Sequence, residues 1–354
     1  MKESSPSIQE WENLYDTAIK FREIECWNWM YDSDMFGVQS PVDGEIGYCC
    51  VMGKLGEHFA LATYLGTDGL EGYLKIQSGE ISLSNNDMDI LHIQKCLMAS
   101  FEDRQYLQKP DLQVIKKLGL NFRGRNSWPL FRSYRPGYHP WYLTSDEAEY
   151  LTLTLQQTIE VALRFKDDPD MLTSPEENHY LVRVPKKEDE GWRWRDEWLE
   201  PPALQKIEVV SVPIDEVRLE RIEKIASRRP AVWEVDFFYF PGGVGEKKER
   251  PYYPYVFLCM EHNSHLILNT DLAGPSDYRL KFPEQFLNFI EKVKVLPSEI
   301  LVSKEEMFKL LAPASSRLSI KLRWVKRLAA MEEAKDSMFE FFPRGSDNSN
   351  EVVL

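Results

Sequence analysis

Basic and aromatic side chains alternate over one stretch of the chain that contains no carboxylate. Gln113 to Ser145 holds six positive charges in a protein of formal net charge -14. Its basic residues are Lys116, Lys117, Arg123, Arg125, Arg132 and Arg135, and its aromatic residues include Trp128, Phe131, Tyr134, Tyr138, Trp141 and Tyr142. Guanidinium groups among aromatic rings can bind phosphates or carboxylates, stack on bases, or join two domains through cation–π contacts. We call this stretch the arginine–aromatic belt.

The belt supplies the candidate ligand-binding residues, which are Arg123, Arg125, Arg132, Arg135, Tyr138 and Trp141. A second acid-free stretch, Met307 to Met331, carries Lys309, Arg317, Lys321, Arg323, Lys326 and Arg327. If both stretches line one cleft, they attract an anionic partner by focusing the local field. If each faces acidic surfaces of neighbouring domains, they are structural, and the acidic composition favours this second arrangement.

Carboxylates in the last third of the chain offer a different chemistry. The candidates for an alternative catalytic site are Asp236, Glu284, Glu291, Glu332 and Asp336. A nuclease that uses two metal ions needs several carboxylates that converge from different elements. Solvated or capping roles are the simpler interpretation of these residues, so the primary prediction contains no catalytic residue, no metal and no cofactor.

Two histidine-containing groups are weaker candidates for metal or acid–base chemistry. His262 and His265 are three residues apart across an expected turn, whereas the helical zinc motif places its histidines four apart. Asp32, Asp34 and His58 could form a carboxylate–histidine group. Turn and capping duties are the favoured interpretation of both groups.

Composition limits the class of protein. A chain of 354 residues exceeds the usual size of one hydrophobic core, which predicts two or three domains. The pI near 5.1 argues against broad adhesion to nucleic acid or to an anionic membrane, so nucleic acid could bind only at local basic patches. Five scattered cysteines predict free thiols in a reducing compartment. With no apolar signal core and no apolar run long enough to span a membrane, we expect a cytoplasmic protein without membrane contact.

Hydrophobic patterns predict the elements that position these residues. A helix through Trp11 and Arg22 precedes three strands, DMFGVQS, EIGYCCVMG and HFALATYLG, joined as antiparallel hairpins. A helix capped by Thr67 and Asp68 follows, and then a helical region from about residue 87 to 101. The belt contains too many prolines for a continuous helix in its second half. A Thr144–Glu147 capping box opens the next helix, and HYLVRVPK, GWRWRDEWL and KIEVVSVP form a second antiparallel group.

The last third has the element order βββαβαβα. Its strands are AVWEVDFFYFP, YPYVFLCM, HLILNTDL, EILV and SIKLR, with helices from Pro283 to Val293, after a Ser303–Glu306 cap, and to about Phe342. This is the order of the ribonuclease H-like fold, an antiparallel meander followed by parallel strands joined by helices. Ser303 and Lys304 stand where that fold's nuclease pattern places an aspartate, which weakens the nuclease interpretation.

Two segments resemble domains of unknown function found in uncharacterised bacterial proteins. The first carries Trp27–Asp34 (WNWMYDSD), Phe36-Gly37-Val38, IGYCCVMG, and the pattern from Trp128 to Trp141. The second runs from about Pro254 to Phe342. The resemblance implies a bacterial cytosolic protein and carries no established activity.

The predicted fold class is a multi-domain α+β protein with antiparallel meanders. The expected domains are residues 1–112, residues 113–227 with the belt, residues 228–342 with ribonuclease H-like order, and a flexible tail at 343–354. The favoured function is a non-catalytic binding or regulatory protein that recognises a protein or a small anionic ligand. The alternative is a divergent metal-dependent enzyme that processes nucleic acid.

Overall fold

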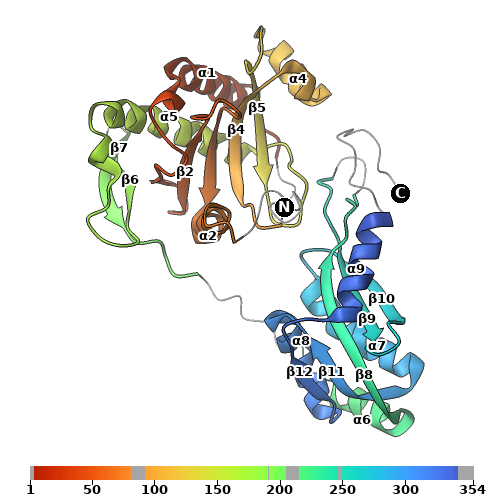
Figure 1. Ribbon diagram of the computed structural model, residues 1–354. Helices are drawn as coiled ribbons and strands as arrows, with labels where there is room; N and C mark the ends of the chain where they lie inside the picture. Colours follow the sequence, from red (N-terminus) through yellow and green to blue (C-terminus); the bar gives the residue numbers. More distant parts are fainter. Residues whose placement is uncertain (1–3, 81–91, 190, 205–214, 246–248, 342–354) are drawn as a thin grey trace. The chain divides into compact units, whose positions relative to one another are not determined.

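A computed structural model describes residues 4–80, 92–189, 191–204, 215–245 and 249–341. Within them the chain forms two compact units, each with its own mixed sheet (Figure 1). Unit 1 extends to Leu204 apart from Gly137–His139, and these three residues group with unit 2. The α+β fold class is confirmed. The expected division between residues 112 and 113 falls inside unit 1, because strands on either side of it pair in one sheet.

Unit 1 is built on a seven-stranded sheet of order β5-β4-β3-β2-β1-β6-β7. Its strands are β1 (Phe36–Gln39), β2 (Ile46–Met52), β3 (Ala60–Leu65), β4 (Cys96–Glu102), β5 (Trp128–Tyr134), β6 (Tyr180–Glu188) and β7 (Gly191–Leu199). Its helices are α1 (Ile8–Ile24), α2 (Gly66–Gln77), α4 (Lys109–Lys117) and α5 (Ser145–Asp167), with short 3-10 turns η1 (Cys26–Asn28), η2 (Arg104–Tyr106) and η3 (Pro169–Leu172). Neighbouring strands are antiparallel except for β1 and β6, which run parallel.

Alternation along the strands gives unit 1 two cores. Cys49 of β2 packs in the larger core with α1 and α5, whereas Cys50 points to the opposite face, where α2 contributes Leu70 and Tyr73. Adjacent strand residues face opposite sides of a sheet, so these two thiols cannot pair. All five cysteines are buried and free.

Unit 2 is built on a five-stranded sheet of order β10-β9-β8-β11-β12. Its strands are β8 (Ser227–Tyr239), β9 (Tyr255–Glu261), β10 (Ile267–Ala273), β11 (Val295–Val302) and β12 (Lys321–Trp324). Its helices are α6 (Glu216–Ile225), α7 (Tyr278–Val293), α8 (Glu305–Arg317) and α9 (Ala329–Phe341). The first three strands form an antiparallel meander, and β8, β11 and β12 are parallel. The predicted element order of the last third is therefore confirmed.

The two faces of this sheet are covered by different helices. Val235 and Phe237 of β8 pack in a core with α6, α7 and α8, and Phe238 packs in the core that α9 completes with Ala330 and Met331. Residues of β8 with even numbers therefore lie toward α9 and residues with odd numbers lie toward α7. This alternation decides which carboxylates can meet.

Several local predictions were wrong. The helical region expected at residues 87–101 overlaps β4 (Cys96–Glu102). A short apolar run that is buried on both faces has no period that distinguishes a helix from a strand. Residues 87–91 of that prediction, the strand KIEVVSVP and the tail after residue 341 lie outside the described residues. The helices α4 and α6 were not predicted, although Pro110 and Asp111 lie in the first turn of α4 and Asp215 caps α6.

The predicted caps of two helices were also wrong. α2 begins at Gly66 with Leu65 at its N-cap, and α8 begins at Glu305 with Lys304 at its N-cap, and neither N-cap residue makes a side-chain capping bond. Ser303 donates its hydroxyl to Asp236 instead. The strong Thr144–Glu147 capping box is present at the start of α5.

Candidate functional site

Asp236 is the first candidate catalytic residue, and it is buried among basic groups. Its side chain is 1% exposed. Oδ2 accepts from Lys335 Nζ of α9 at 2.8 Å and from Ser303 Oγ at 3.4 Å, while Lys304 Nζ lies 3.5 Å from Oδ1. The Phe237 amide also donates to Oδ1 at 2.8 Å. Two ammonium groups thus neutralise the one carboxylate, which satisfies a buried charge without a metal ion.

Glu234 lies two residues earlier on the same face of β8 and is fully buried. Its Oε1 is 2.6 Å from His262 Nδ1, and its Oε2 accepts from the Met331 amide of α9 at 3.0 Å. His262 therefore pairs with a carboxylate of β8, and His265 pairs with Glu333 at 2.7 Å. The two histidines have separate partners, in keeping with the turn interpretation.

The structure does not bring the alternative catalytic carboxylates together. Glu284 and Glu291 lie on α7, across the sheet from Asp236, and both pair with Arg218 at 2.7 and 2.9 Å. Glu332 pairs with Arg327, and Asp336 is exposed on α9. Among the described residues, no three His, Cys, Asp or Glu side chains form a group that could hold a metal ion.

Two arginines of the belt are held by carboxylates of unit 1. Arg132 forms a two-point pair with Asp111 of α4 at 2.9 and 2.8 Å, and its guanidinium lies 4.8 Å from the centre of the Tyr142 ring. Both partners are only 10% exposed as side chains. Arg135 lies 3.0 Å from Glu147, the residue that closes the capping box of α5. These contacts fix α4 and α5 against β5.

The other belt candidates have different surroundings. Arg125 is 90% exposed and lies 3.8 Å from Asp103, and Arg123 is exposed. The backbone of Trp141 pairs with Ser133. Within unit 2, Tyr138 forms a backbone bridge with Tyr252 and lies under the guanidinium of Arg250. The six candidate residues therefore do not share one environment.

Five of the six basic residues in the second acid-free stretch pair with carboxylates inside unit 2. Lys309 pairs with Glu305, Arg317 with three glutamates of α6, and Arg327 with Glu332. Lys321 and Arg323 both contact Glu299 of β11. These basic residues thus pair with carboxylates that lie outside the acid-free stretch in the sequence.

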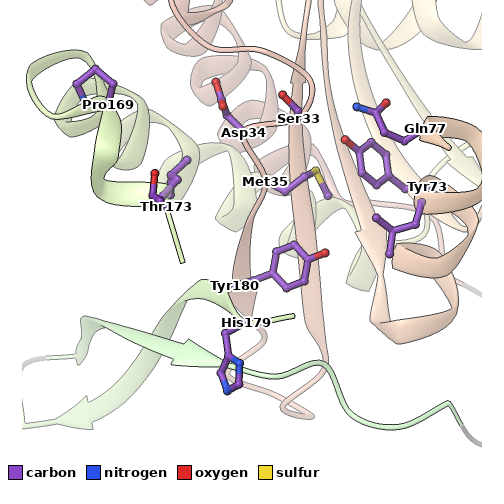
Figure 2. A pocket seen from close by; sticks show the side chains of 11 residues that line it. Ser33, Asp34, Met35, Tyr73, Gln77, Pro169, Thr173, His179 and Tyr180 are labelled. Carbon is purple, nitrogen blue, oxygen red and sulfur yellow. The ribbon is translucent and has the colours of Figure 1, made fainter. Parts of the chain in front are cut away.

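Unit 1 contains a cavity of about 310 Å³ that sequence reasoning did not identify (Figure 2). It lies where the parallel strands β1 and β6 begin, between α2 and η3. Its lining comprises Ser33, Asp34, Met35, Tyr73, Leu74, Gln77, Pro169, Leu172, Thr173, His179 and Tyr180. Figure 2 shows Met35, Tyr73 and Tyr180 around one space and the imidazole of His179 apart from them.

Asp34 ends the turn that leads into β1. Its Oδ2 accepts from the Tyr31 amide at 2.7 Å, which confirms the predicted turn role. His58, the alternative partner considered for Asp32 and Asp34, lies 3.6 Å from Glu102. Asp34 therefore combines a turn role with a place in the lining of the cavity.

The tyrosines of the cavity are firmly held. The Tyr73 hydroxyl donates to the Asp32 carbonyl at 2.9 Å, and the Tyr180 ring packs edge-on against Tyr48 at 5.4 Å. Burial raises the pKa of Tyr73, and the neighbouring acidic groups Cys50, Asp32 and Asp34 raise it further. The rings are thus neutral, fixed walls of the cavity.

The protein is a two-unit α+β protein, and each unit has its own mixed sheet. Each unit contains a region that matches a protein family. Residues 11–183 match Domain of unknown function (DUF7309), and residues 218–339 match Domain of unknown function (DUF6930). The chain is therefore similar to these two families over two successive regions, as the sequence resemblance predicts. Among curated proteins, none matches the chain. In the part of the chain that the structure describes, no helix is both long and apolar enough to span a membrane.

Proposed function

We propose that this protein is a non-catalytic binding protein whose first unit holds a small organic ligand in the cavity between α2 and η3. The observation that carries this proposal is the cavity itself, which joins an apolar and aromatic wall to a few polar groups. Ligand sites in proteins have this composition and typically enclose roughly 300–1,000 Å³. At about 310 Å³, this cavity suits a ligand at the small end of that range.

The surroundings of Asp236 support a non-catalytic role for unit 2. The order and directions of its strands favour a ribonuclease H-like arrangement, in which Asp236 occupies the first strand. Lys304 and Lys335 supply the positive charge beside this aspartate. The second unit then has a structural role, because a protein can retain a fold without the catalytic activity found in other proteins of that fold.

The contacts of the belt favour the cavity over the belt as the ligand site. Arg132 and Arg135 are already paired with Asp111 and Glu147, so an anion would have to compete with these carboxylates. Breaking the buried pair of Arg132 and Asp111 costs several kcal/mol. The belt then acts mainly in the packing of unit 1.

A variant that fills the cavity tests this proposal. Thr173 is exposed at the cavity edge, and Thr173→Trp would place a large ring there. A library of small organic compounds is screened for those that raise the melting temperature of the wild type, since a ligand at 100 times its Kd adds about 2.7 kcal/mol of stability. Glu177→Trp, an exposed position outside the cavity lining, is the matched control.

We expect stabilising compounds to act on the wild type and on Glu177→Trp, and to lose their effect on Thr173→Trp. Stabilisation that is equal in all three proteins would show that the compounds bind elsewhere and would overturn the proposal.

A further inference from the structure

The cavity of unit 1 has an uneven distribution of charge. Asp34 supplies the one carboxylate of its lining, which contains neither lysine nor arginine. In the described part of the chain, the carboxylate of Asp34 accepts one hydrogen bond, from Tyr31, and forms no ion pair. A carboxylate has room for several donors, so Asp34 keeps accepting capacity at the cavity.

His179 does not offer a matching site for an anion. Its Nδ1 lies 3.0 Å from the Glu177 carbonyl, and its Nε2 lies 3.5 Å from Glu176 Oε2. Both ring nitrogens therefore already face oxygen atoms of the protein. A bound carboxylate or phosphate would meet Asp34 without gaining a free donor from His179.

The walls of the cavity suit a cation with an apolar body. Tyr73 and Tyr180 present aromatic rings, and Met35 adds a thioether between them (Figure 2). The faces of such rings attract ammonium groups even at sites that are open to solvent. Burial and Cys50 raise the pKa of Tyr73 most, and the charges of Asp32 and Asp34 raise it further, in keeping with a negative field at this wall.

We infer that the cavity takes a small organic amine, whose ammonium group pairs with Asp34 and whose apolar body lies against Tyr73, Tyr180 and Met35. This inference rests on the proposed function, because it names the ligand class of the same cavity. A charge-assisted hydrogen bond is roughly twice as strong as a neutral one, so Asp34 selects the amine over a neutral molecule of equal size.

Three probes of similar shape test this selectivity by calorimetric titration: phenethylammonium, 2-phenylethanol and 3-phenylpropionate. We expect phenethylammonium to bind at least about tenfold more tightly than the alcohol, which corresponds to about 1.4 kcal/mol, and the carboxylate to bind most weakly. Asp34→Asn keeps an oxygen that can accept from the Tyr31 amide and removes the charge. This variant should weaken the amine at least about tenfold and leave the alcohol within about twofold.

Glu12→Gln is the control for net charge, because Glu12 is exposed on α1, which packs on the opposite face of the sheet. It should leave the binding of the amine unchanged. Equal affinity for the three probes, or an amine affinity unchanged in Asp34→Asn, would overturn the assignment of an amine. If Thr173→Trp still abolishes binding of the alcohol or the carboxylate, the cavity remains a ligand site of another class. If no probe binds and no library compound depends on the cavity, both proposals fail.

Discussion

Lys335 of α9 donates to the buried carboxylate of Asp236 at 2.8 Å, and this contact is one of a pair. Four residues earlier on α9, the Met331 amide donates to Glu234, which is two residues before Asp236 on β8. The two acceptors are two strand residues apart, or about 6.6 Å, and the two donors are four helix residues apart, or about 6 Å. The spacing of the donors on α9 therefore matches the spacing of the acceptors on β8. The Met331 amide is one of the first four of its helix, which lack an acceptor within the helix. Two buried carboxylates thus fasten α9 to the sheet.

Asp236→Asn should destabilise unit 2. The variant keeps the volume of the side chain but leaves the partly exposed Lys304 and Lys335 without their carboxylate, which costs about 1–3 kcal/mol. Urea unfolding measures the change, with Asp336→Asn on the exposed side of α9 as the control, expected within about 0.5 kcal/mol of the wild type. A variant as stable as the wild type would contradict the role of Asp236 as an anchor.

Mg²⁺ should not stabilise the wild-type protein. Lys304 and Lys335 already supply the positive charge beside Asp236, and α7 carries Glu284 and Glu291 on the other side of the sheet. Thermal unfolding with and without millimolar MgCl₂ tests this expectation. A rise in melting temperature that disappears in Asp236→Asn would instead favour the metal-dependent enzyme that the sequence leaves as an alternative.

Arg132→Ala should destabilise unit 1 by about 3 kcal/mol, because it leaves the carboxylate of Asp111 buried without its partner. Asp111→Ala should have a similar effect. The double variant should lose less than the sum of the two, since the second substitution removes an already unpaired charge. Free energies of unfolding for the four proteins give the coupling. Additive losses would show that Arg132 and Asp111 act independently and would leave Arg132 available for a ligand.

Glu147 should make the stability of unit 1 depend on pH in the acid range. Burial alone would raise its pKa, but hydrogen bonds from the Thr144 amide, Arg135 and Ser133 outweigh burial and lower the pKa of Glu147. A carboxylate with a lowered pKa stabilises the fold at pH values above its unfolded pKa of about 4.3. The contribution is lost as the pH falls through the lower pKa of the folded state.

Glu147→Gln isolates this contribution, because glutamine can still complete the capping box. We expect the wild type to be about 1–2 kcal/mol more stable than the variant at pH 7, with the difference shrinking below pH 4.3. Unfolding free energies at several pH values measure the difference. A gap that stays constant to pH 3 would contradict the assigned ionisation.

Short sequence patterns predicted the helices and strands whose ends or buried faces depend on neighbouring residues. The capping box at Thr144 and Glu147 predicts the start of α5, and alternating apolar residues predict the meander of β8, β9 and β10. β4 was missed because it is buried on both faces and has no alternating pattern. The acid-free belt was noticed, but the partner of Arg132 is Asp111, two residues before the stretch begins. A search limited to the acid-free stretch therefore misses Asp111, the carboxylate that pairs with Arg132.

The cavity could not be predicted because it depends on pairing between distant segments. β1 and β6 run parallel, with Gly37 opposite Val182, and the chain between them passes through the rest of the sheet. Only this pairing brings Asp34 and Tyr180 to the same end of the strands. Asp34 was singled out for its turn role, whereas Tyr73 and Tyr180 look like ordinary core aromatics in the sequence.

Methyl NMR tests most directly whether a ligand binds in the cavity next to Met35. Met35 lines the cavity, whereas Met307 is fully buried in the core of unit 2. In protein labelled at its methionine methyl groups, phenethylammonium should shift the Met35 resonance progressively to saturation and leave the Met307 resonance unchanged. Thr173→Trp should suppress this response. An unmoved Met35 resonance at saturating probe, or equal shifts of both resonances, would contradict the account.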